Sequence, residues 1–154
     1  MSGTLYVVAT PIGNLEDISF RALRVLREVS LIAAEDTRRT AKLLQHYSIL
    51  TPTTSFHAHN EKRKQVLLLN KLNNDQAIAL VSDAGTPTIS DPGALIVAAA
   101  TEAGIRVEVI PGPSAVITAI SASGLLTGAF TFVGFSPSRL KDRIPWLNEL
   151  TNEE

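Results

Sequence analysis

Residues 77–93 read AIALVSDAGTPTISDPG, and they contain a complete strand–loop–helix transition. The run at 77–81 is short, continuously apolar and bounded by turn residues, which predicts a strand buried on both faces. The loop at 82–90 is long and rich in glycine, proline and small polar residues. Asp91 and Pro92 then predict the start of a helix, as its N-cap and its first helical residue. Such a unit is the repeating element of a parallel α/β sheet.

The same alternation continues on both sides of this unit. Apolar runs predict three further strands, at 5–9, 31–34 and 106–110. Residues 51–60 are polar, and they form either a loop or a short strand at about 53–56. Helices are expected between the strands and after the last of them, starting near Asp17, at a Thr37 cap, at Glu61 and at Ser114. Gly104 is expected just beyond the end of the helix that Asp91 opens. We therefore predict an α/β fold, in which a parallel sheet carries helices on both faces in an αβα arrangement.

The pattern changes after Gly124. An aromatic-rich run at 130–135 predicts a strand, and a basic helix is expected at about 141–150. One strand and one helix cannot form a domain by themselves. We therefore interpret residues 1–125 as an N-terminal α/β domain, and residues 126–154 as the beginning of a second, incomplete α/β domain.

Composition excludes several classes of protein. The chain has 154 residues, of which 45% are apolar and 19% charged, with 14 Lys+Arg against 15 Asp+Glu. The absence of cysteine excludes disulfides, thiolate metal sites and a cysteine nucleophile. A formal charge of -1 excludes a generally basic nucleic-acid coat. The N-terminus lacks a basic signal-peptide region, and no run approaches the ~18 apolar residues of a membrane span, so we expect a cytoplasmic protein without a membrane partner.

Three loops are candidates for ligand binding, because each follows a predicted strand and is dense in Gly, Pro and small polar residues. They lie at 10–14, 82–90 and 111–114. In open α/β sheets ligands bind where such loops gather at the carboxyl ends of the strands. Each loop could also be a plain strand-to-helix turn. No G-x-G-x-x-G or G-x-x-x-x-G-K-[ST] motif is present, so a site here would hold its ligand by backbone groups and shape, which suits an adenosine or sulfonium ligand better than a triphosphate.

Charged residues and histidines near these loops have two interpretations each. Glu35 and Asp36 either complement the dipole of the helix that follows or accept a proton, and Asp83 is equally ambiguous. His57 and His59 form an H-x-H pair, but no third ligand at a suitable spacing accompanies them, so we favour a solvated loop and expect no metal site. Basic clusters either face solvent or contact phosphates, and they comprise Arg38, Arg39 and Lys42, residues 62–64, and Arg139, Lys141 and Arg143.

Four stretches of the chain resemble one known family. They are TLYVVATPIGNLEDISFRAL (4–23), LIAAEDTRRTAKLL (31–44), ALVSDAGTPTISDPG (79–93) and VEVIPGPSAVITAISASGL (107–125). They are similar to the tetrapyrrole-methylase-type, class III S-adenosylmethionine-dependent methyltransferases. The VSDAGTP and AEDTR segments resemble the branch that methylates a cytidine ribose 2′-hydroxyl in small-subunit (16S) ribosomal RNA.

The resemblance implies a fold, a methyl donor and a set of site residues. The family has two α/β domains with S-adenosyl-L-methionine bound in the cleft between them, and it implies a homodimer that acts on small-subunit rRNA or the 30S subunit. Carried over by motif, the donor-binding residues are Pro11, Ile12, Gly13, Asp83, Gly85, Thr86, Ile89, Ser114 and Ala115. A hydroxyl nucleophile needs a base, and our candidates in order are Asp36, Asp83 and Glu35. Under this hypothesis, RNA phosphates would be held by Arg38, Arg39 and Lys42.

Two alternatives remain open at this point. The same donor site could serve a tetrapyrrole (precorrin) methyltransferase, whose acceptor is a corrin-ring carbon. The chain could also be a non-catalytic N-terminal-domain fragment that binds the adenosyl ligand weakly or not at all.

Overall fold

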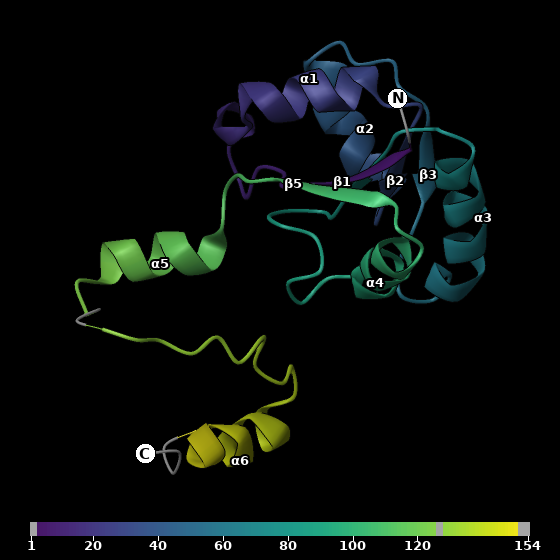
Figure 1. Cartoon of the computed structure of the whole chain (residues 1–154). Helices are drawn as coiled ribbons and strands as arrows, with labels where there is room; N and C mark the ends of the chain where they lie inside the picture. The colour runs from purple at the N-terminus through teal and green to yellow at the C-terminus, as the bar shows by residue number, and fades with distance from the viewer. Residues whose placement is uncertain (1–2, 126–127, 151–154) are drawn as a thin grey trace. The chain divides into compact units, whose positions relative to one another are not determined.

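The computed structural model describes residues 3–125 and 128–150 of the chain, which divides into two compact units at Gly124. The first unit is built on a five-stranded sheet with the strand order β3-β2-β4-β1-β5, in which all pairs are parallel (Figure 1). The strands are β1 (Thr4–Val8), β2 (Leu31–Ala34), β3 (Thr53–Ser55), β4 (Ile78–Val81) and β5 (Arg106–Ile110). The predicted parallel α/β sheet is therefore confirmed.

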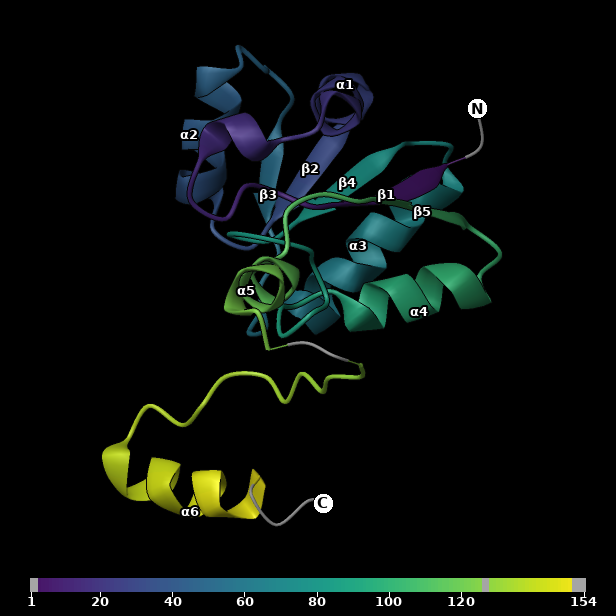
Figure 2. The same cartoon turned by 90° about the vertical axis from the view of Figure 1, so that its left-hand side faces the viewer.

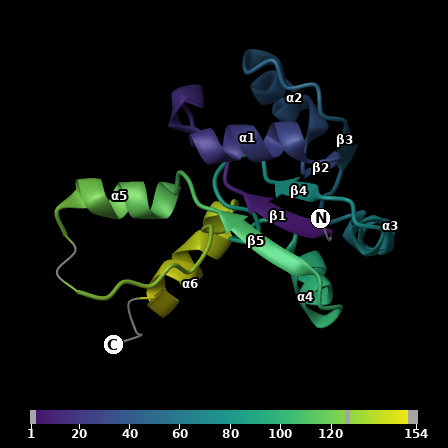
Figure 3. The same ribbon diagram turned by 45° about the horizontal axis from the view of Figure 1, so that its top comes forward.

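Helices cover both faces of this sheet (Figure 2). One face carries α1 (Phe20–Glu28) and α2 (Thr37–His46), and the other carries α3 (Glu61–Asn73) and α4 (Ala94–Glu102). A single 3-10 turn, η1 (Leu15–Asp17), precedes α1. After β5 the chain forms α5 (Ala115–Ser123), which projects away from the sheet and has no buried residue (Figure 3).

The central strand β4 shows why both faces are covered. Its side chains alternate between the faces, as the two-residue period of a strand requires. Ala79 and Val81 pack with α1 and α2, whereas Ile78 and Leu80 pack with α3 and α4. All four residues are buried, which is the burial that a continuous apolar run predicts.

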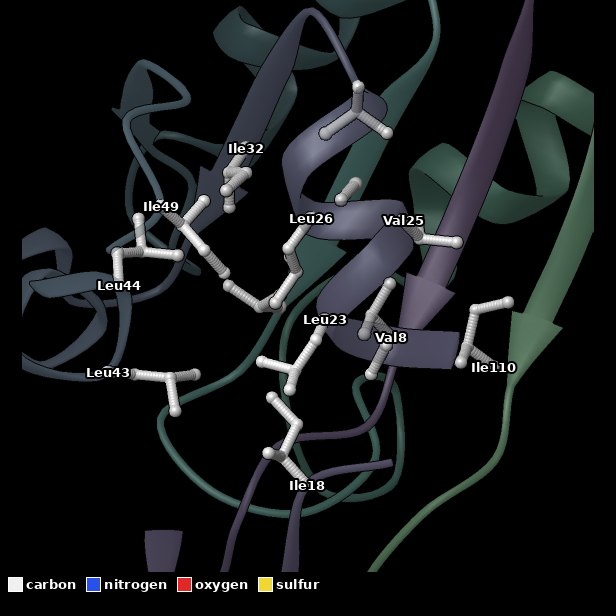
Figure 4. Packing of buried hydrophobic residues seen from close by; sticks show 14 of the residues in the cluster. Val8, Ile18, Leu23, Val25, Leu26, Ile32, Leu43, Leu44, Ile49 and Ile110 are labelled. Carbon is white, nitrogen blue, oxygen red and sulfur yellow. The ribbon is translucent and has the colours of Figure 1, made fainter. Parts of the chain in front are cut away.

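The core on the α1 and α2 face joins distant parts of the chain (Figure 4). Leu23 and Leu26 of α1 lie over the sheet, where they belong to one buried cluster with Val8 and Ile110 from the neighbouring strands β1 and β5. Leu44 of α2 belongs to the same cluster. This packing fixes α1 and α2 against the sheet, and with them the loops from which they start.

The strand register places the carboxyl ends of the strands side by side. Val8 is paired with Ile110, Val7 with Leu80, and Ala34 with Val81. Because all five strands are parallel, the loops that leave them share one edge of the sheet. We call it the carboxyl edge.

Three helix starts differ from the sequence prediction. The helix expected from Asp17 begins at Phe20, because Ser19 caps it by accepting a hydrogen bond from the Ala22 backbone N–H. The cap of α2 is Asp36 rather than Thr37, since the Asp36 carboxylate accepts the Arg38 backbone N–H.

The third difference concerns α4. Asp91 and Pro92 do not open this helix, because Gly93, with a φ of 125°, is its N-cap. The Gly93 N–H instead donates to the side chain of Glu61 at the start of α3. Gly104 does lie just beyond the end of α4, with a φ of 68° in the left-handed region, as predicted.

The second unit contains α6 (Leu140–Leu150), as predicted, but the predicted strand at 130–135 is wrong. A strand needs a neighbour for its backbone groups, and within residues 128–150 no other strand is available. Residues 126–127 and 151–154 lie outside the described residues, so the interpretation of 126–154 as the beginning of a second domain stays a prediction. Across the two described stretches, no helix combines the length and the apolarity needed to cross a membrane.

The burial of β4 gives a direct test of the core. We expect Leu80→Ala to lower the free energy of unfolding by about 2–5 kcal/mol, because Leu80 is only 1% exposed and the change leaves a cavity. The matched control is Leu50→Ala, which should change it by less than about 0.5 kcal/mol because Leu50 is 96% exposed. Urea unfolding of both variants measures the difference, and equal losses would contradict the described core.

Candidate functional site

The three candidate loops follow three neighbouring strands, in the order β4, β1, β5. Thr10 and Gly85 exchange two backbone hydrogen bonds, of 2.9 Å and 3.0 Å, which tie the loop after β1 to the loop after β4. On the other side of β1, a Cβ added at Gly112 would lie 3.0 Å from the Ala9 Cβ, so the loop after β5 also approaches β1 closely. The structure therefore brings all three loops together at the carboxyl edge.

The loop after β4 has an unusual backbone. Gly85 and Gly93 have φ values of 82° and 125°, in the region that favours glycine. Thr88 and Ser90 also have positive φ values, of 76° and 60°, although they carry side chains. Such conformations cost of order 1–3 kcal/mol each and concentrate at ligand-binding sites. Of the three loops, the loop after β4 therefore has the backbone conformation that is most typical of a ligand-binding site.

Several backbone groups of these loops are free to bind an adenosyl ligand. Within the described part of the chain, the backbone N–H groups of Ile12, Gly13 and Gly112 donate to no protein acceptor. A Cβ at Gly13 would meet no atom within 4 Å, so the chain leaves space beside this loop. Unpaired N–H groups beside open space suit a ligand that is bound through the main chain.

The other predicted donor-binding residues lie along the same edge. Ile89 is 55% exposed in the loop after β4, and Thr86 is half-buried beside it. The Ser114 hydroxyl caps α5 by accepting the Ile117 backbone N–H at 3.4 Å, and Ala115 is the exposed first residue of that helix. Their roles in ligand binding remain predictions.

A first hollow at this edge joins the loops to the basic helix α2. Its volume is about 190 Å³, and its lining includes Pro11 and Asp83 from the loops together with Arg39 and Lys42 from α2. Ligand sites usually have volumes of about 300–1,000 Å³. The first hollow therefore offers one wall of a site for a nucleoside-sized ligand rather than an enclosing cavity.

A reciprocal pair of hydrogen bonds joins the ends of β2 and β4. The Glu35 carboxylate accepts the Asp83 backbone N–H at 3.2 Å, and the Asp83 carboxylate accepts the Asp36 backbone N–H at 3.0 Å. Asp83 also lies 3.4 Å from the Arg39 guanidinium. The three predicted base candidates are thus assembled in one place, although they are 47 or 48 residues apart across the two loops.

The surroundings of Glu35 and Asp36 push their pKa values in opposite directions. Side-chain hydrogen bonds from Arg38, of 2.7 Å and 3.1 Å, hold the pKa of the Asp36 carboxyl well below its usual range. Burial raises the pKa of Glu35, and the nearby negative charges of Asp83 and Asp91 raise it further. Burial also raises the pKa of Asp91, which accepts a hydrogen bond from Ser82. Of the adjacent residues Glu35 and Asp36, Glu35 is the better proton acceptor, because its pKa is raised and that of Asp36 is lowered.

A second hollow, of about 360 Å³, lies at the ends of β2 and β3. Its wall consists of residues at and just after the ends of these two strands, namely Glu35, Asp36, Thr37, Arg38, Ser55, His57 and His59. Sequence reasoning missed this grouping, because β3 is short and its place beside β2 is decided by strand pairing. Among the described residues no group of three His, Cys, Asp or Glu side chains could hold a metal ion.

The opposed pKa values can be measured directly. We expect a carboxyl titration followed by NMR to place the midpoint of Glu35 above its ordinary 4.5 and that of Asp36 below its ordinary 3.8. In an Arg38→Ala variant the Asp36 midpoint should rise toward 3.8, because its main hydrogen-bond donor is gone, while Glu35 keeps its raised value. If the Asp36 midpoint is the same in the variant, the hydrogen bonds from Arg38 are not the cause of the lowered pKa.

Comparison with known proteins adds a family and relatives to this geometry. A family model described as Tetrapyrrole (Corrin/Porphyrin) Methylases matches residues 4–152. The ribosomal RNA small subunit methyltransferase I of Pasteurella multocida is 52% identical over 154 residues, covering 100% of this chain and 55% of that protein. The protein of the same name from Escherichia coli O157:H7 is 57% identical over 141 residues, covering 92% and 49%. The chain therefore spans about half the length of the curated relatives it matches.

A solved structure has a similar fold at much lower sequence identity. Uroporphyrin-III-C-methyltransferase from Thermus thermophilus superposes with a TM-score of 0.62 at 22% identity, covering 82% of this chain and 54% of that one. At this level of identity the likeness concerns the fold, and the acceptor of that enzyme says nothing about this chain.

Proposed function

The chain belongs to the tetrapyrrole (corrin/porphyrin) methylase family, and we propose that it forms the donor-binding part of an S-adenosyl-L-methionine-dependent rRNA methyltransferase. The acceptor in this proposal is a cytidine ribose 2′-hydroxyl of small-subunit (16S) rRNA. The observation that carries the proposal is the meeting of the loops after β1, β4 and β5 at one edge, in a chain 52–57% identical to relatives named for small-subunit rRNA methylation.

The donor-binding role rests on the free backbone groups of the loops. Ile12, Gly13 and Gly112 offer N–H groups, while the exposed Ile89 side chain offers an apolar surface. When bound, the donor supplies an activated methyl group. The task of the chain is to hold that group in line with the acceptor and to limit the access of water. The stiff, strained loop after β4 suits such positioning, because its backbone is fixed before the ligand arrives.

We assign the base to Glu35, ahead of Asp83 and Asp36. A hydroxyl is a poor nucleophile while protonated, so a carboxylate takes its proton as the oxygen forms its bond to the methyl carbon. Asp36 is a poor base because Arg38 stabilises its charged form and lowers its pKa. Glu35 has a raised pKa and lies in the wall of the second hollow, where an acceptor can approach.

Arg38, Arg39 and Lys42 are proposed to hold the RNA backbone beside the two hollows. The side chains of Arg38 and Arg39 are 89% and 68% exposed, so they can reach a phosphate. Arg39 and Lys42 line the first hollow, and Arg38 lines the second. Contacts of this kind position an RNA without reading its sequence.

Family resemblance also leads us to propose a homodimer. Among the described residues, Val109 of the edge strand β5 and Ile117 of α5 are more than half exposed. Exposed apolar surface of this kind favours association, either with a second copy or with further protein. Sedimentation of the chain at several concentrations tests this proposal.

Donor binding is the first test, and it also separates the proposal from the non-catalytic alternative. We expect S-adenosylhomocysteine to bind the 154-residue chain in a calorimetric titration, and Gly13→Val to weaken this binding at least tenfold by filling the open space beside the loop. The control is Gly104→Ala, at the opposite edge of the sheet, which strains the left-handed turn after α4 but should leave binding unchanged. A chain that does not bind this ligand would support the non-catalytic reading.

The base is tested by paired substitutions in the full natural protein. Glu35→Gln should reduce methyl transfer to small ribosomal subunits about 100-fold, because the amide cannot take the proton. Asp36→Asn should have a much smaller effect, since asparagine also caps helices. In the unmodified protein the rate should fall as the pH drops through the raised pKa of Glu35. Equal losses in the two variants would remove Glu35 from the role.

The tetrapyrrole alternative predicts a different acceptor for the same donor site. Labelled methyl groups should enter small-subunit rRNA and not a precorrin when both are offered together. The identity of 52–57% to relatives named for rRNA methylation supports the rRNA acceptor.

A further inference from the structure

The second hollow is unused by the donor loops. Its wall is formed by residues at the ends of β2 and β3, and it shares no lining residue with the first hollow. Its volume of about 360 Å³ falls within the range of small-molecule sites. It lies at the same carboxyl edge, beside the acidic residues that join β2 to β4.

The charged groups of this wall can bind both hydroxyls and an anion. Glu35 offers a carboxylate, which accepts hydrogen bonds from hydroxyl groups. Arg38 uses Nε and Nη2 to bind Asp36, and among the described residues its Nη1 group has no acceptor. A guanidinium that is partly paired and highly exposed can still donate to a phosphate oxygen.

Asn60 contacts both the backbone and the ring of His57. The Asn60 Oδ1 accepts the His57 backbone N–H at 2.9 Å, so the amide group of Asn60 has a defined orientation. Its Nδ2 lies within hydrogen-bond distance of the Ser55 carbonyl at 3.3 Å, the Ser55 Oγ at 3.1 Å and the His57 Nε2 at 3.1 Å. When Nε2 accepts one of the two hydrogens of this amide, a neutral His57 ring carries its proton on Nδ1.

The Nδ1 atom of His57 is a polar atom without a hydrogen-bond partner among the described residues. Nδ1 is buried and, within residues 3–125 and 128–150, has no hydrogen-bond acceptor. A buried donor that lacks an acceptor is costly, and in a native structure it calls for a reason. His57 itself lies in the wall of the second hollow, so a ligand bound there contacts the residue that carries this atom.

The two histidine rings add a surface for a flat group. The ring centroids of His57 and His59 are 5.9 Å apart, with an angle of 66° between the planes. His59 is exposed, so one face of its ring is open to a stacking partner. Proteins commonly hold an unstacked RNA base against aromatic or histidine rings.

We propose that the second hollow binds one nucleotide of the RNA substrate, with its ribose hydroxyls on Glu35, its phosphate on Arg38 and its base against His59. His57 lines the same wall beside His59. This inference rests on the proposed function, because it identifies where the acceptor lies beside the donor loops. It also gives the H-x-H pair a role other than metal binding.

The three histidines of the chain provide a built-in control for the test. Cytidine 5′-monophosphate is added at millimolar concentration to the 154-residue chain, and the imidazole signals are followed by NMR. We expect the signals of His57 and His59 to shift and saturate, while His46 at the end of α2 keeps its position. Equal shifts of all three signals, or no shift at all, would overturn the proposal.

Variants and simpler probes define which groups take part. His59→Ala should weaken binding of the nucleotide about tenfold through the loss of stacking, and because His59 is exposed the variant should fold normally. His46→Ala is the matched control and should bind as the unmodified chain does. If inorganic phosphate alone reproduces the shifts, the hollow is an anion site and the nucleotide proposal is wrong.

Titration with S-adenosylhomocysteine separates this inference from the proposed function. The His59→Ala variant should bind that ligand as tightly as the unmodified chain, because His59 lines the second hollow and is absent from the wall of the first. Binding of S-adenosylhomocysteine without any nucleotide shift would overturn the subsite and leave the methyltransferase proposal standing. Nucleotide binding without S-adenosylhomocysteine binding would support the subsite and count against the donor site.

Discussion

The parallel pairing of β4 with β1 on one side and β2 on the other is the constraint on which the rest of the structure depends. These pairings bring the carboxyl ends of three strands to one level, so the loops that follow them must share an edge. The alternating side chains of β4 then tie this edge to helices on both faces. A change that loosened β4 would therefore disturb the loops without touching any residue in them.

The carboxyl edge has two halves of different chemistry. Around β1 and β5 it is made of glycine, proline and free backbone groups, which suits a ligand bound by shape. Around β2 and β3 it is made of carboxylates, guanidinium and imidazole groups, which suits a polar ligand with hydroxyls and phosphate. Asp83, at the end of β4, stands at the boundary, since it lines the first hollow and binds the backbone at the end of β2. Under the proposed function the methyl donor lies on the first half and the acceptor on the second, which is the arrangement that group transfer needs.

The opposed pKa shifts of Glu35 and Asp36 show how strongly the surroundings decide the chemistry of two carboxyl groups. The two carboxylates are adjacent in the chain, yet Asp36 caps α2 and pairs with Arg38, whereas Glu35 is partly buried near other negative charges. The first group is held charged and the second is biased toward its neutral form. From the sequence Asp36 was the preferred base, because neither the Arg38 contact nor the burial of Glu35 is visible there.

The sequence by itself determined the α/β class, the positions of four of the five strands and the three candidate loops, because apolar runs and turn residues act locally. It left open whether residues 53–56 form a strand, because only pairing with β2 decides this. The starts of α1, α2 and α4 were predicted less accurately, because the N-cap residues Ser19, Asp36 and Gly93 cannot be identified from composition alone. It also predicted a strand at 130–135 that has no neighbour to pair with among the described residues. Only the tertiary structure decided the grouping of Glu35, Asp83 and His57, because strand order is set by long-range pairing and packing.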